Sequence, residues 1–209
     1  MRIWNLLIKK LRANPLPRPL VSIYLSLRWR CFVHPAARIA YPLGLQIGRG
    51  AIVGRCQISA LHVDKCNGGD VQKYAISIGE NSVIHDYTIL NTHGGHIQIG
   101  DAVTLHPFSV IYGYGGVKIG DGTRIATSTV IVASNHEISD SMETVAERWS
   151  GKGIQIGSDV WIGAGARILD GSNIQDRSVI GAGSVVTSTV PRASIAAGVP
   201  ARVLRQRFS

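Results

Sequence analysis

The chain has 209 residues, of which 45% are hydrophobic, 17% charged and 6% aromatic, and it contains 24 glycines. This length fits one domain of ordinary size and argues against a two-domain enzyme. The composition excludes a disordered or collagen-like chain and favours a β-rich fold with many tight turns. The few aromatic residues argue against a protein that binds nucleic acid by base stacking.

The net charge of +9 comes entirely from the N-terminal third. Residues 1–63 contain ten basic residues and no acidic one, whereas the rest of the chain has 12 basic and 13 acidic residues, a balance of −1. A basic segment of this kind suits nucleic acid or an anionic membrane surface. Because no nucleic-acid-binding motif is recognisable, we expect no nucleic-acid partner.

The cysteine pattern and the N-terminal hydropathy favour a cytoplasmic protein. The three cysteines form no CxxC pair, and the start of the chain lacks the uninterrupted apolar core of a signal peptide. The longest uncharged stretch near the N-terminus, Pro19 to Leu27, is far shorter than the roughly 20 residues that span a bilayer.

Residues 1–38 form a basic N-terminal segment that does not share the pattern of the rest. Apolar residues at helical spacing between Ile3 and Leu11, beside basic ones, predict a short amphipathic helix that ends at Asn14. A second apolar piece runs from Leu20 to Leu27. The segment suits contact with the inner face of the membrane, and it equally suits a helix that caps the next domain or packs on a neighbouring subunit.

Residues 39–200 carry aliphatic side chains with a period of six. The C-terminal half shows it at Ile156, Ile162, Ile168, Ile174, Ile180 and Val186. The upstream ladders are Ile119, Ile125 and Ile131, then Ile99, Leu105, Ile111 and Val117, then Ile78, Ile84 and Leu90, with faint matches at Ile47 and Val53. A period of six fits neither a helix nor simple alternation, but it fits short strands with one inward aliphatic each, separated by turns. Three strands make a coil, and stacked coils bury a continuous core.

One long excursion interrupts the ladder, between residues 133 and 153. Insertions on a repeat scaffold form loops on one face, which is often the functional face. Residues 201–209 follow the last repeat as a basic C-terminal tail.

The repeats resemble those of the hexapeptide-repeat acyltransferases, in the branch of galactoside, maltose and polysaccharide O-acetyltransferases. The resemblance covers about Ile78 to Arg205 and is carried by GIQIGSDVWIG from Gly153, VIGAGSVVT from Val179 and AGVPARVLR from Ala197. It implies an all-β fold, a left-handed parallel β-helix with one extended catalytic loop. It also implies transfer of an acetyl group from acetyl-coenzyme A to a sugar hydroxyl, by a homotrimer with active sites between subunits.

The resemblance assigns the catalytic base to His136, at the mouth of the loop. The chemistry agrees, since a neutral imidazole can take the proton of a hydroxyl near neutral pH. Asn135 is expected to contact the substrate. The group that orients His136 stays open among a backbone carbonyl and the acidic residues Glu137, Asp140, Glu143 and Glu147.

Further residues match binding positions of the family. Trp161 matches a tryptophan that borders the acyl and acceptor pocket, which we favour over the alternative of a surface aromatic packed on the next coil. The positions that line coenzyme A are matched by Gly163, Ala164, Ala182, Thr187, Arg202 and Arg205. The two arginines would meet the nucleotide phosphates.

Two departures from the family concern the ligands. Ser188 stands where related enzymes often have a lysine, so one phosphate contact differs. His106 stands where the galactoside branch has an asparagine that touches the sugar. We therefore expect a different acceptor, with His106 either contacting another sugar or facing outward after the inward Leu105.

Three other interpretations stay open or are set aside. N-acetylation of an amino sugar or an antibiotic needs the same base, and a non-catalytic trimeric scaffold needs none. Residue types that can bind zinc occur at His62, His93, His96, Cys56 and Cys66. No pair of them has structural-zinc spacing, so we expect no metal.

Overall fold

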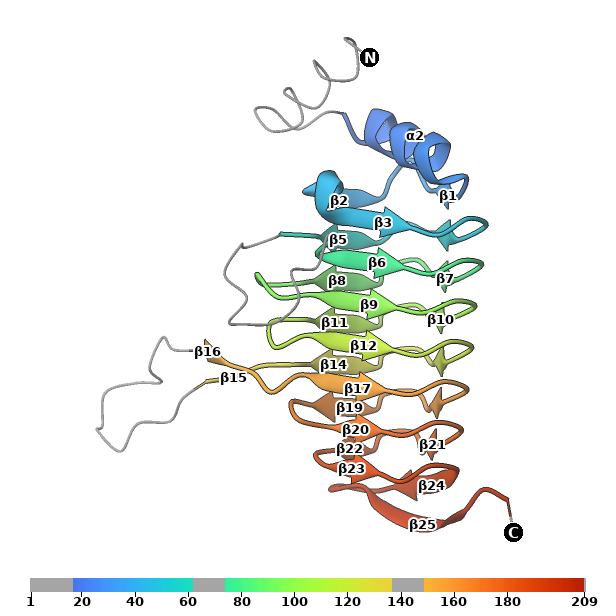
Figure 1. Ribbon diagram of the computed structural model, residues 1–209, viewed down its shortest axis with the longest axis vertical. Coiled ribbons are helices and arrows are strands. Elements are labelled where there is room, and N and C mark those ends of the chain that lie inside the picture. Colours follow the sequence, from blue (N-terminus) through green and yellow to red (C-terminus); the bar gives the residue numbers. More distant parts are fainter. Residues whose placement is uncertain (1–16, 62–73, 137–148, 209) are drawn as a thin grey trace, which may run out of the picture.

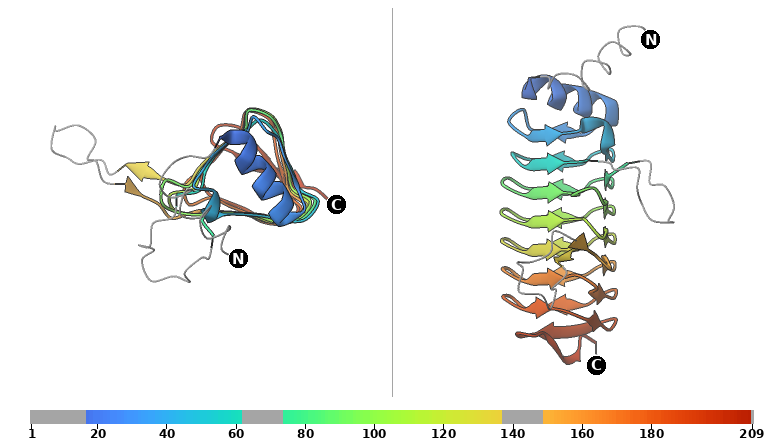
Figure 2. Two further views of the ribbon diagram at one scale, coloured as in Figure 1. Left: turned by 90° about the horizontal axis from the view of Figure 1, so that it is seen from above. Right: turned by 90° about the vertical axis from the view of Figure 1, so that its left-hand side faces the viewer.

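The computed structural model describes residues 17–61, 74–136 and 149–208. Within these ranges the chain winds into a parallel β-helix, a tall prism of triangular cross-section whose faces are three sheets (Figures 1 and 2). An α-helix lies across one end of the prism, and a pair of strands projects from its side (Figure 2). The predicted fold of stacked coils is confirmed.

The strands of the described residues fall on faces that we name A, B and C. Face A consists of β1 (Phe32–Val33), β4 (Ile52–Val53), β7 (Val83–Ile84), β10 (Thr104–Leu105), β13 (Arg124–Ile125), β18 (Trp161–Ile162), β21 (Val179–Ile180), β24 (Ser194–Ala197) and β25 (Arg202–Gln206). Face B consists of β2 (Arg38–Ala40), β5 (Gln57–Ser59), β8 (Ile89–Asn91), β11 (Val110–Tyr112), β14 (Val130–Val132), β19 (Arg167–Leu169) and β22 (Val185–Val186). Face C consists of β3 (Leu45–Ile47), β6 (Ile76–Ile78), β9 (Ile97–Ile99), β12 (Val117–Ile119), β17 (Ile154–Ile156), β20 (Asn173–Ile174) and β23 (Thr189–Val190).

The prism edges take the names of the faces that they join. In the middle coil, edge AB is residues 126–129 between β13 and β14, and edge CA is residues 120–123 between β12 and β13. Edge BC is where β14 ends, and the long excursion leaves the prism there. The projecting pair is β15 (Asn135–His136) and β16 (Trp149–Ser150), and a 3₁₀ turn, η1 (Pro42–Gly44), joins β2 to β3.

Parallel pairing in register stacks like residues on one another and forms the core. On face A, Leu105 pairs with Ile84 on one side and with Ile125 on the other. Every side chain of the six-residue ladders is at most 3% exposed, which confirms the predicted inward positions. The faint matches Ile47 and Val53 belong to regular coils too.

Aspartates tie consecutive coils together along edge CA. The Asp101 carboxylate accepts the N–H of Glu80 at 2.7 Å, and the Asp121 carboxylate accepts the N–H of Asp101 at 2.8 Å. The glycine before each aspartate is required because the coils are so close. A Cβ on Gly100 would collide with the Asp121 carboxylate. This packing explains the recurrent Gly-Asp pairs of the sequence.

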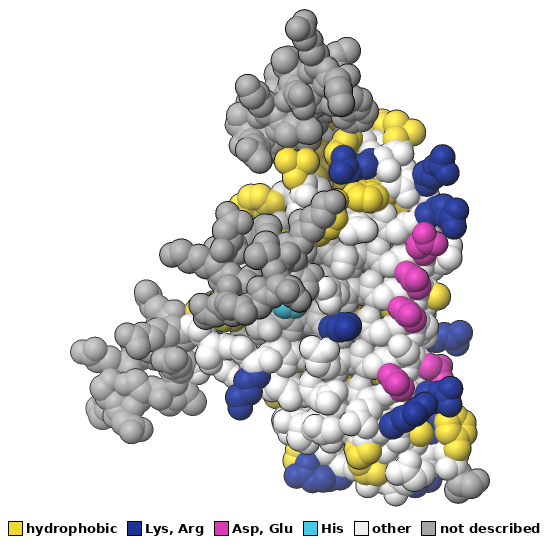
Figure 3. Space-filling view, viewed as in Figure 1, with side chains coloured by type: hydrophobic (Ala, Val, Ile, Leu, Met, Phe, Trp, Pro, Cys, Tyr) yellow, Lys and Arg dark blue, Asp and Glu magenta, His cyan; other side chains and the backbone are white. Residues whose placement is uncertain are grey.

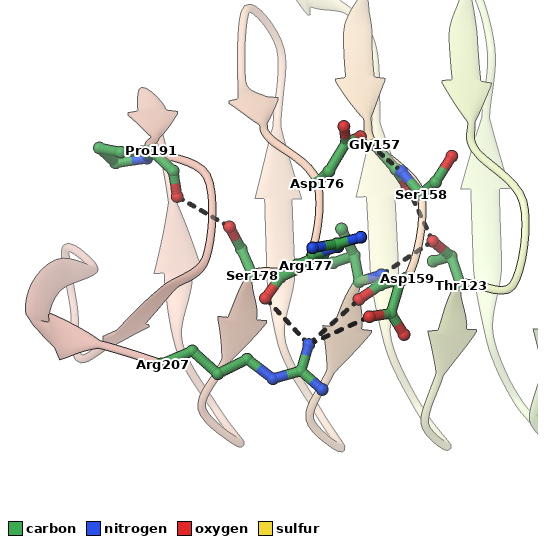
Figure 4. Close-up of polar contacts among 10 residues, drawn as sticks. Thr123, Gly157, Ser158, Asp159, Asp176, Arg177, Ser178, Pro191 and Arg207 are labelled. Atoms are coloured by element: carbon green, nitrogen blue, oxygen red, sulfur yellow. Dashed lines mark hydrogen bonds and ion pairs between the residues drawn. The ribbon is translucent and has the colours of Figure 1, made fainter. Parts of the chain in front are cut away.

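The C-terminal residues fold back onto the prism. Strand β25 pairs antiparallel with β24, so residues 202–206 form part of face A where a basic tail was expected. Arg207 donates to the carbonyl oxygen of Arg177 at 2.9 Å and lies 3.4 Å from the Asp159 carboxylate (Figure 4). These contacts hold the chain end against edge CA.

Helix α2 (Arg18–Trp29) covers the opposite end of the prism. Proline in its first turn costs no hydrogen bond, because the N–H groups there have no partner within the helix. Val21, Tyr24 and Leu25 recur at helical spacing and are buried over the first coil. Capping by a helix, one of the three roles expected for the N-terminal segment, is therefore observed for α2.

The first coil begins early in the chain. Strand β1 starts at Phe32 and pairs with β4, so the coil opens before the boundary expected at residue 38. The amphipathic helix predicted between Ile3 and Leu11 lies outside the described residues. In the ranges that the structure describes, no helix is long and apolar enough to cross a membrane.

The core predicts a contrast between two isoleucine truncations. Ile111→Ala removes a side chain that is 0% exposed, and should lower the free energy of unfolding by about 2–5 kcal/mol. Ile52→Ala, at a position 46% exposed on face A, should cost less than about 1 kcal/mol. Chemical denaturation followed by circular dichroism measures both. Equal losses would show that the six-residue ladder does not carry the core.

Candidate active site at two edges of the prism

The strands β15 and β16 form the base of a hairpin at edge BC. They pair antiparallel, with Asn135 opposite Ser150 and His136 opposite Trp149. The residues between the two strands, 137–148, lie outside the described part of the chain, as do the four acidic candidates for orienting His136. His136 is exposed, and it lies where the chain leaves the prism.

Asp170 fixes both strands of the hairpin to the prism. It follows β19, one coil below the excursion, and its carboxylate accepts the N–H groups of Lys152 and Gly153 at 2.9 Å. The same carboxylate accepts the side-chain amide of Asn135 at 3.0 Å. A charged acceptor with three donors holds the neighbours of His136 in a defined place.

An aromatic cluster surrounds the base of the hairpin. The ring centroid of Trp149 lies 4.7 Å from that of His136, 5.7 Å from that of His93 and 5.7 Å from that of Tyr114. The Tyr114 hydroxyl donates to the Trp149 carbonyl oxygen at 3.1 Å. The Nε2 atom of His93 is buried and has no hydrogen-bond partner among the described residues. The cluster thus gives the exposed imidazole of His136 one aromatic wall.

Edge AB presents bare backbone in the C-terminal coils. Gly163, Ala164 and Ala182 lie there together, because β18 and β21 both end at this edge. A Cβ on Gly163 would lie 2.6 Å from the backbone nitrogen of Ala182, so the two turns stack directly. Gly183 has φ +67° and faces open space. Small residues leave this stretch accessible to a ligand that binds backbone groups.

In the preceding coils, edge AB carries stacked aromatic side chains in place of small residues. His106 lies parallel to His85, with ring centroids 5.1 Å apart and 13° between the planes. Phe108 lies on Tyr87 in the same way, at 5.2 Å and 7°. Phe108 and Tyr87 are about half exposed. His106 therefore belongs to an exposed aromatic patch on the same edge as Gly163.

The remaining predicted residues lie apart from these groups. Trp161 is 56% exposed on face A, next to Arg124 and Val179 of the neighbouring coils. Thr187 lies at edge BC, after β22. Arg202 and Arg205 are exposed on β25, where Arg202 pairs with Ala197 near edge AB.

One chain does not bring His136 to the glycine-rich edge. The two are separated by the width of face B, which β14 crosses between residues 129 and 133. A strand of about five residues spans roughly 15 Å. A site that uses both groups either spans face B of one chain or combines edge BC of one copy with edge AB of another.

Thiol and metal chemistry have little support in the described residues. Burial raises the pKa of the Cys56 thiol to about 12 and that of Cys31 to about 11, so neither is a thiolate near neutral pH. Burial also lowers the pKa of His96. Within the described ranges, no three His, Cys, Asp or Glu side chains gather in a way that could hold a metal ion. His62 and Cys66 lie outside them.

Three residues of the site escaped the sequence analysis. Trp149 and Asp170 were not singled out, and His93 was considered only as a metal ligand. The available signal was the symmetry of the loop, since an insertion that leaves and returns at one edge pairs its two ends. Applied to the expected bounds 133 and 153, that rule places residue 136 within one position of its observed partner, Trp149.

Comparison with known proteins gives consistent matches. The family model for the bacterial transferase hexapeptide (six repeats) matches residues 153–188. A galactoside O-acetyltransferase of Escherichia coli is 34% identical over 136 residues, 65% of this chain and 66% of that protein. A dTDP-4-amino-4,6-dideoxy-D-glucose acyltransferase of Escherichia coli is 32% identical over 139 residues, 63% of this chain and 72% of that protein. This chain spans between 44% and 66% of the length of three of its curated relatives.

A solved structure resembles this chain in its three-dimensional fold as well as in its sequence. It is a hexapeptide-repeat acetyltransferase of Vibrio cholerae complexed with acetyl-coenzyme A, with a TM-score of 0.51 and 27% identity over 80% of this chain and 73% of that one. The matches identify the prism as the left-handed β-helix of hexapeptide-repeat proteins.

The anchoring of the hairpin predicts a specific loosening. Asp170→Ala removes the acceptor of the Lys152 and Gly153 amides, and these amides should exchange with deuterium at least about tenfold faster, since a hydrogen bond to a charged group contributes roughly 1.5–3 kcal/mol. Asp170→Asn keeps a carbonyl acceptor and should stay closer to the native rate. Native-state hydrogen exchange measures both variants. Unchanged exchange in Asp170→Ala would show that other contacts hold the hairpin.

Proposed function

The chain belongs to the hexapeptide-repeat acyltransferase family. We propose that it transfers an acetyl group from acetyl-coenzyme A to a hydroxyl of a sugar. The observation that carries this proposal is the position of His136. It lies at the base of an anchored hairpin, exposed on one side and walled by Trp149 on the other. This combination suits a proton acceptor that meets its substrate from solvent.

In this proposal His136 acts as general base within a ternary complex. Acetyl-coenzyme A supplies an activated acetyl thioester. His136 accepts the proton of the acceptor hydroxyl as that oxygen bonds to the acetyl carbon. His136 then returns the proton to the leaving sulfur, so the imidazole is regenerated in each cycle. In the same proposal Asn135, whose side-chain amide donates to the Asp170 carboxylate, contacts the acceptor beside the base.

Edge AB has the form that the acyl donor requires. A long, thin pantetheine arm needs a path without large side chains. The turns that contain Gly163 and Ala182 expose only alanine and glycine, at Ala164, Ala182 and Gly183. Arg202 is exposed near the end of this path, and Arg205 is exposed further across face A, opposite Ile195; a guanidinium suits a phosphate. Thr187 lies on a different edge of the same chain, so a contact from it would come from another copy.

The preceding coils of edge AB suit the acceptor. The half-exposed rings of Phe108 and Tyr87 offer flat apolar surface for the C–H face of a sugar, and His106 adds hydrogen-bonding nitrogens beside them. A polysaccharide or its precursor could lie along this row. The galactoside branch has an asparagine in place of His106, which supports a different acceptor here.

A homotrimer joins the two edges. In a cyclic trimer with its axis along the prism, residues of one coil keep their height in every copy. His136 leaves the coil that contains residues 126–129 of edge AB. That height lies between His106, one coil before, and Gly163, one coil after. The base of one copy would therefore meet the neighbouring copy between its acceptor part and its donor part.

N-acetylation of an amino sugar is the second candidate. The relative that acts on a dTDP-linked amino sugar supports it. The same base and the same donor path would serve an amine, so the acceptor alone separates the two reactions.

The proposal is tested by thiol release from acetyl-coenzyme A with panels of sugars, amino sugars and nucleotide sugars. We expect acceptor-dependent release that His136→Ala lowers about 10²-fold or more, mainly in kcat, because general-base catalysis contributes that much. His34→Ala, on the first coil, is the matched control and should stay near the native rate. Release that does not depend on His136 would show that the base is assigned wrongly. No release with any acceptor would favour a non-catalytic scaffold.

A further inference from the structure

The end of the prism that α2 covers has an apolar face with no partner among the residues that the structure describes. Leu20, Ile23 and Leu27 follow one another at helical spacing and are 51%, 53% and 74% exposed. The other side of the helix packs on the first coil through Val21 and Leu25. The three exposed side chains therefore point away from the core, and Figure 3 shows hydrophobic and basic side chains together at this end.

A basic hollow lies below the start of α2, where edge AB meets face B in the first three coils. It has a volume of about 400 Å³, and Arg18 of α2, Arg38 of β2 and Arg55 of edge AB line it together with Tyr87 and Thr88. The Thr88 side chain is 0% exposed, and its hydroxyl has no hydrogen-bond partner among the described residues. The hollow is thus bordered by three arginines and by a buried hydroxyl that has no partner among the described residues.

In two of the three arginines, the positive charge is not offset by an ion pair with a described residue. Arg55 lies 2.9 Å from the Asp86 carboxylate and lowers the pKa of Asp86 through hydrogen bonds from its backbone and side chain. Arg18 and Arg38, by contrast, form no ion pair within the part of the chain that the structure describes. The hollow is therefore a net positive site.

The charge of this end is set by the sequence around it. Residues 17–61 contain six arginines and no acidic residue, whereas acidic side chains line edge CA further along the prism (Figure 3). Two copies meeting through this surface would place like charges against each other. An anionic partner fits it, and a second copy does not.

We propose that the α2 end binds the surface of an anionic membrane, with a lipid phosphate in the hollow between Arg18 and Arg38. The guanidinium fork matches phosphate oxygens, and Leu20, Ile23 and Leu27 enter the boundary between headgroups and acyl chains. Binding by a basic amphipathic helix scales with the apolar area buried and with attraction to anionic lipids.

The distance between the α2 end and the hairpin relates membrane binding to the proposed function. Membrane binding itself does not depend on that function. His136 leaves the prism four coils below the first one, and coils repeat every 4.8 Å or so, which places the hairpin roughly 20 Å below the first coil. Helix α2 adds about 10 Å, so the hairpin lies roughly 30 Å from the membrane end. An acceptor tethered to a lipid could reach it. In a cyclic trimer three such ends would face the same side and bind together.

The test is flotation of the full chain with vesicles of phosphatidylcholine, alone or with about 30% phosphatidylglycerol. We expect binding only to the anionic vesicles, and its loss in about 0.5 M salt. The double variant Arg18→Gln/Arg38→Gln should bind at least about tenfold more weakly, and so should Leu20→Ser/Leu27→Ser. Lys118→Gln/Arg192→Gln, which removes two exposed charges from the face C side, is the matched control and should bind like the native chain.

Several results would overturn the proposal. These are equal binding to both vesicles, an arginine variant that binds like the control, and dimers in place of vesicle binding. Inorganic phosphate that binds the native chain, but not the arginine variant, while no vesicle retains the protein, would assign the hollow to a soluble phosphate. His136→Ala should float like the native chain, so failure of the catalytic proposal is distinguishable from failure of this one.

Discussion

Close stacking of successive coils is the constraint on which the rest of the structure depends. Parallel pairing puts each backbone directly on the next, so closely that a Cβ on Gly163 would lie 2.6 Å from the nitrogen of Ala182. Inward positions must then be aliphatic, whereas turn positions are small, cap the neighbouring coil as Asp121 does, or stack on the like position of the next coil as Phe108 does on Tyr87. Under this constraint the faces of the prism have little freedom to change.

Functional groups are therefore concentrated at the edges. Edge BC releases the hairpin that carries His136, and Asp170 of the next coil holds it in place. Edge AB carries stacked rings in its middle coils and bare backbone in its later ones. A rigid prism cannot bend one edge toward another. Assembly of several copies is the means by which such edges can meet, and this requirement underlies the trimer in our proposal.

The periodic part of the fold was predictable because it depends on local spacing alone. One aliphatic every six residues identifies the strands, the inward side chains and the break at residue 133, and the structure confirms these positions. The sequence also led to edge AB residues such as Gly163 and Ala182 through motifs that belong to the turns.

What was not predictable involves contacts between segments that do not share the period. The pairing of His136 with Trp149 depends on how an insertion closes, and the role of Asp170 depends on which outward side chain lies under that insertion. The same holds for β25, whose basic residues suggested a tail but pair with β24 once the prism ends. Periodicity specifies which residues face inward, and leaves the partners of outward residues undetermined.

Subunit complementation tests the central claim, that edge BC of one copy works with edge AB of its neighbour. His136→Ala removes the base, and Ala182→Trp, at an exposed position, fills the donor path. Each variant alone should be inactive. Unfolded together in equal amounts and refolded, they should regain about a quarter of the native thiol release, since random assembly pairs an intact base with an intact edge in about one site of four. A mixture that folds and assembles but stays inactive would contradict the account.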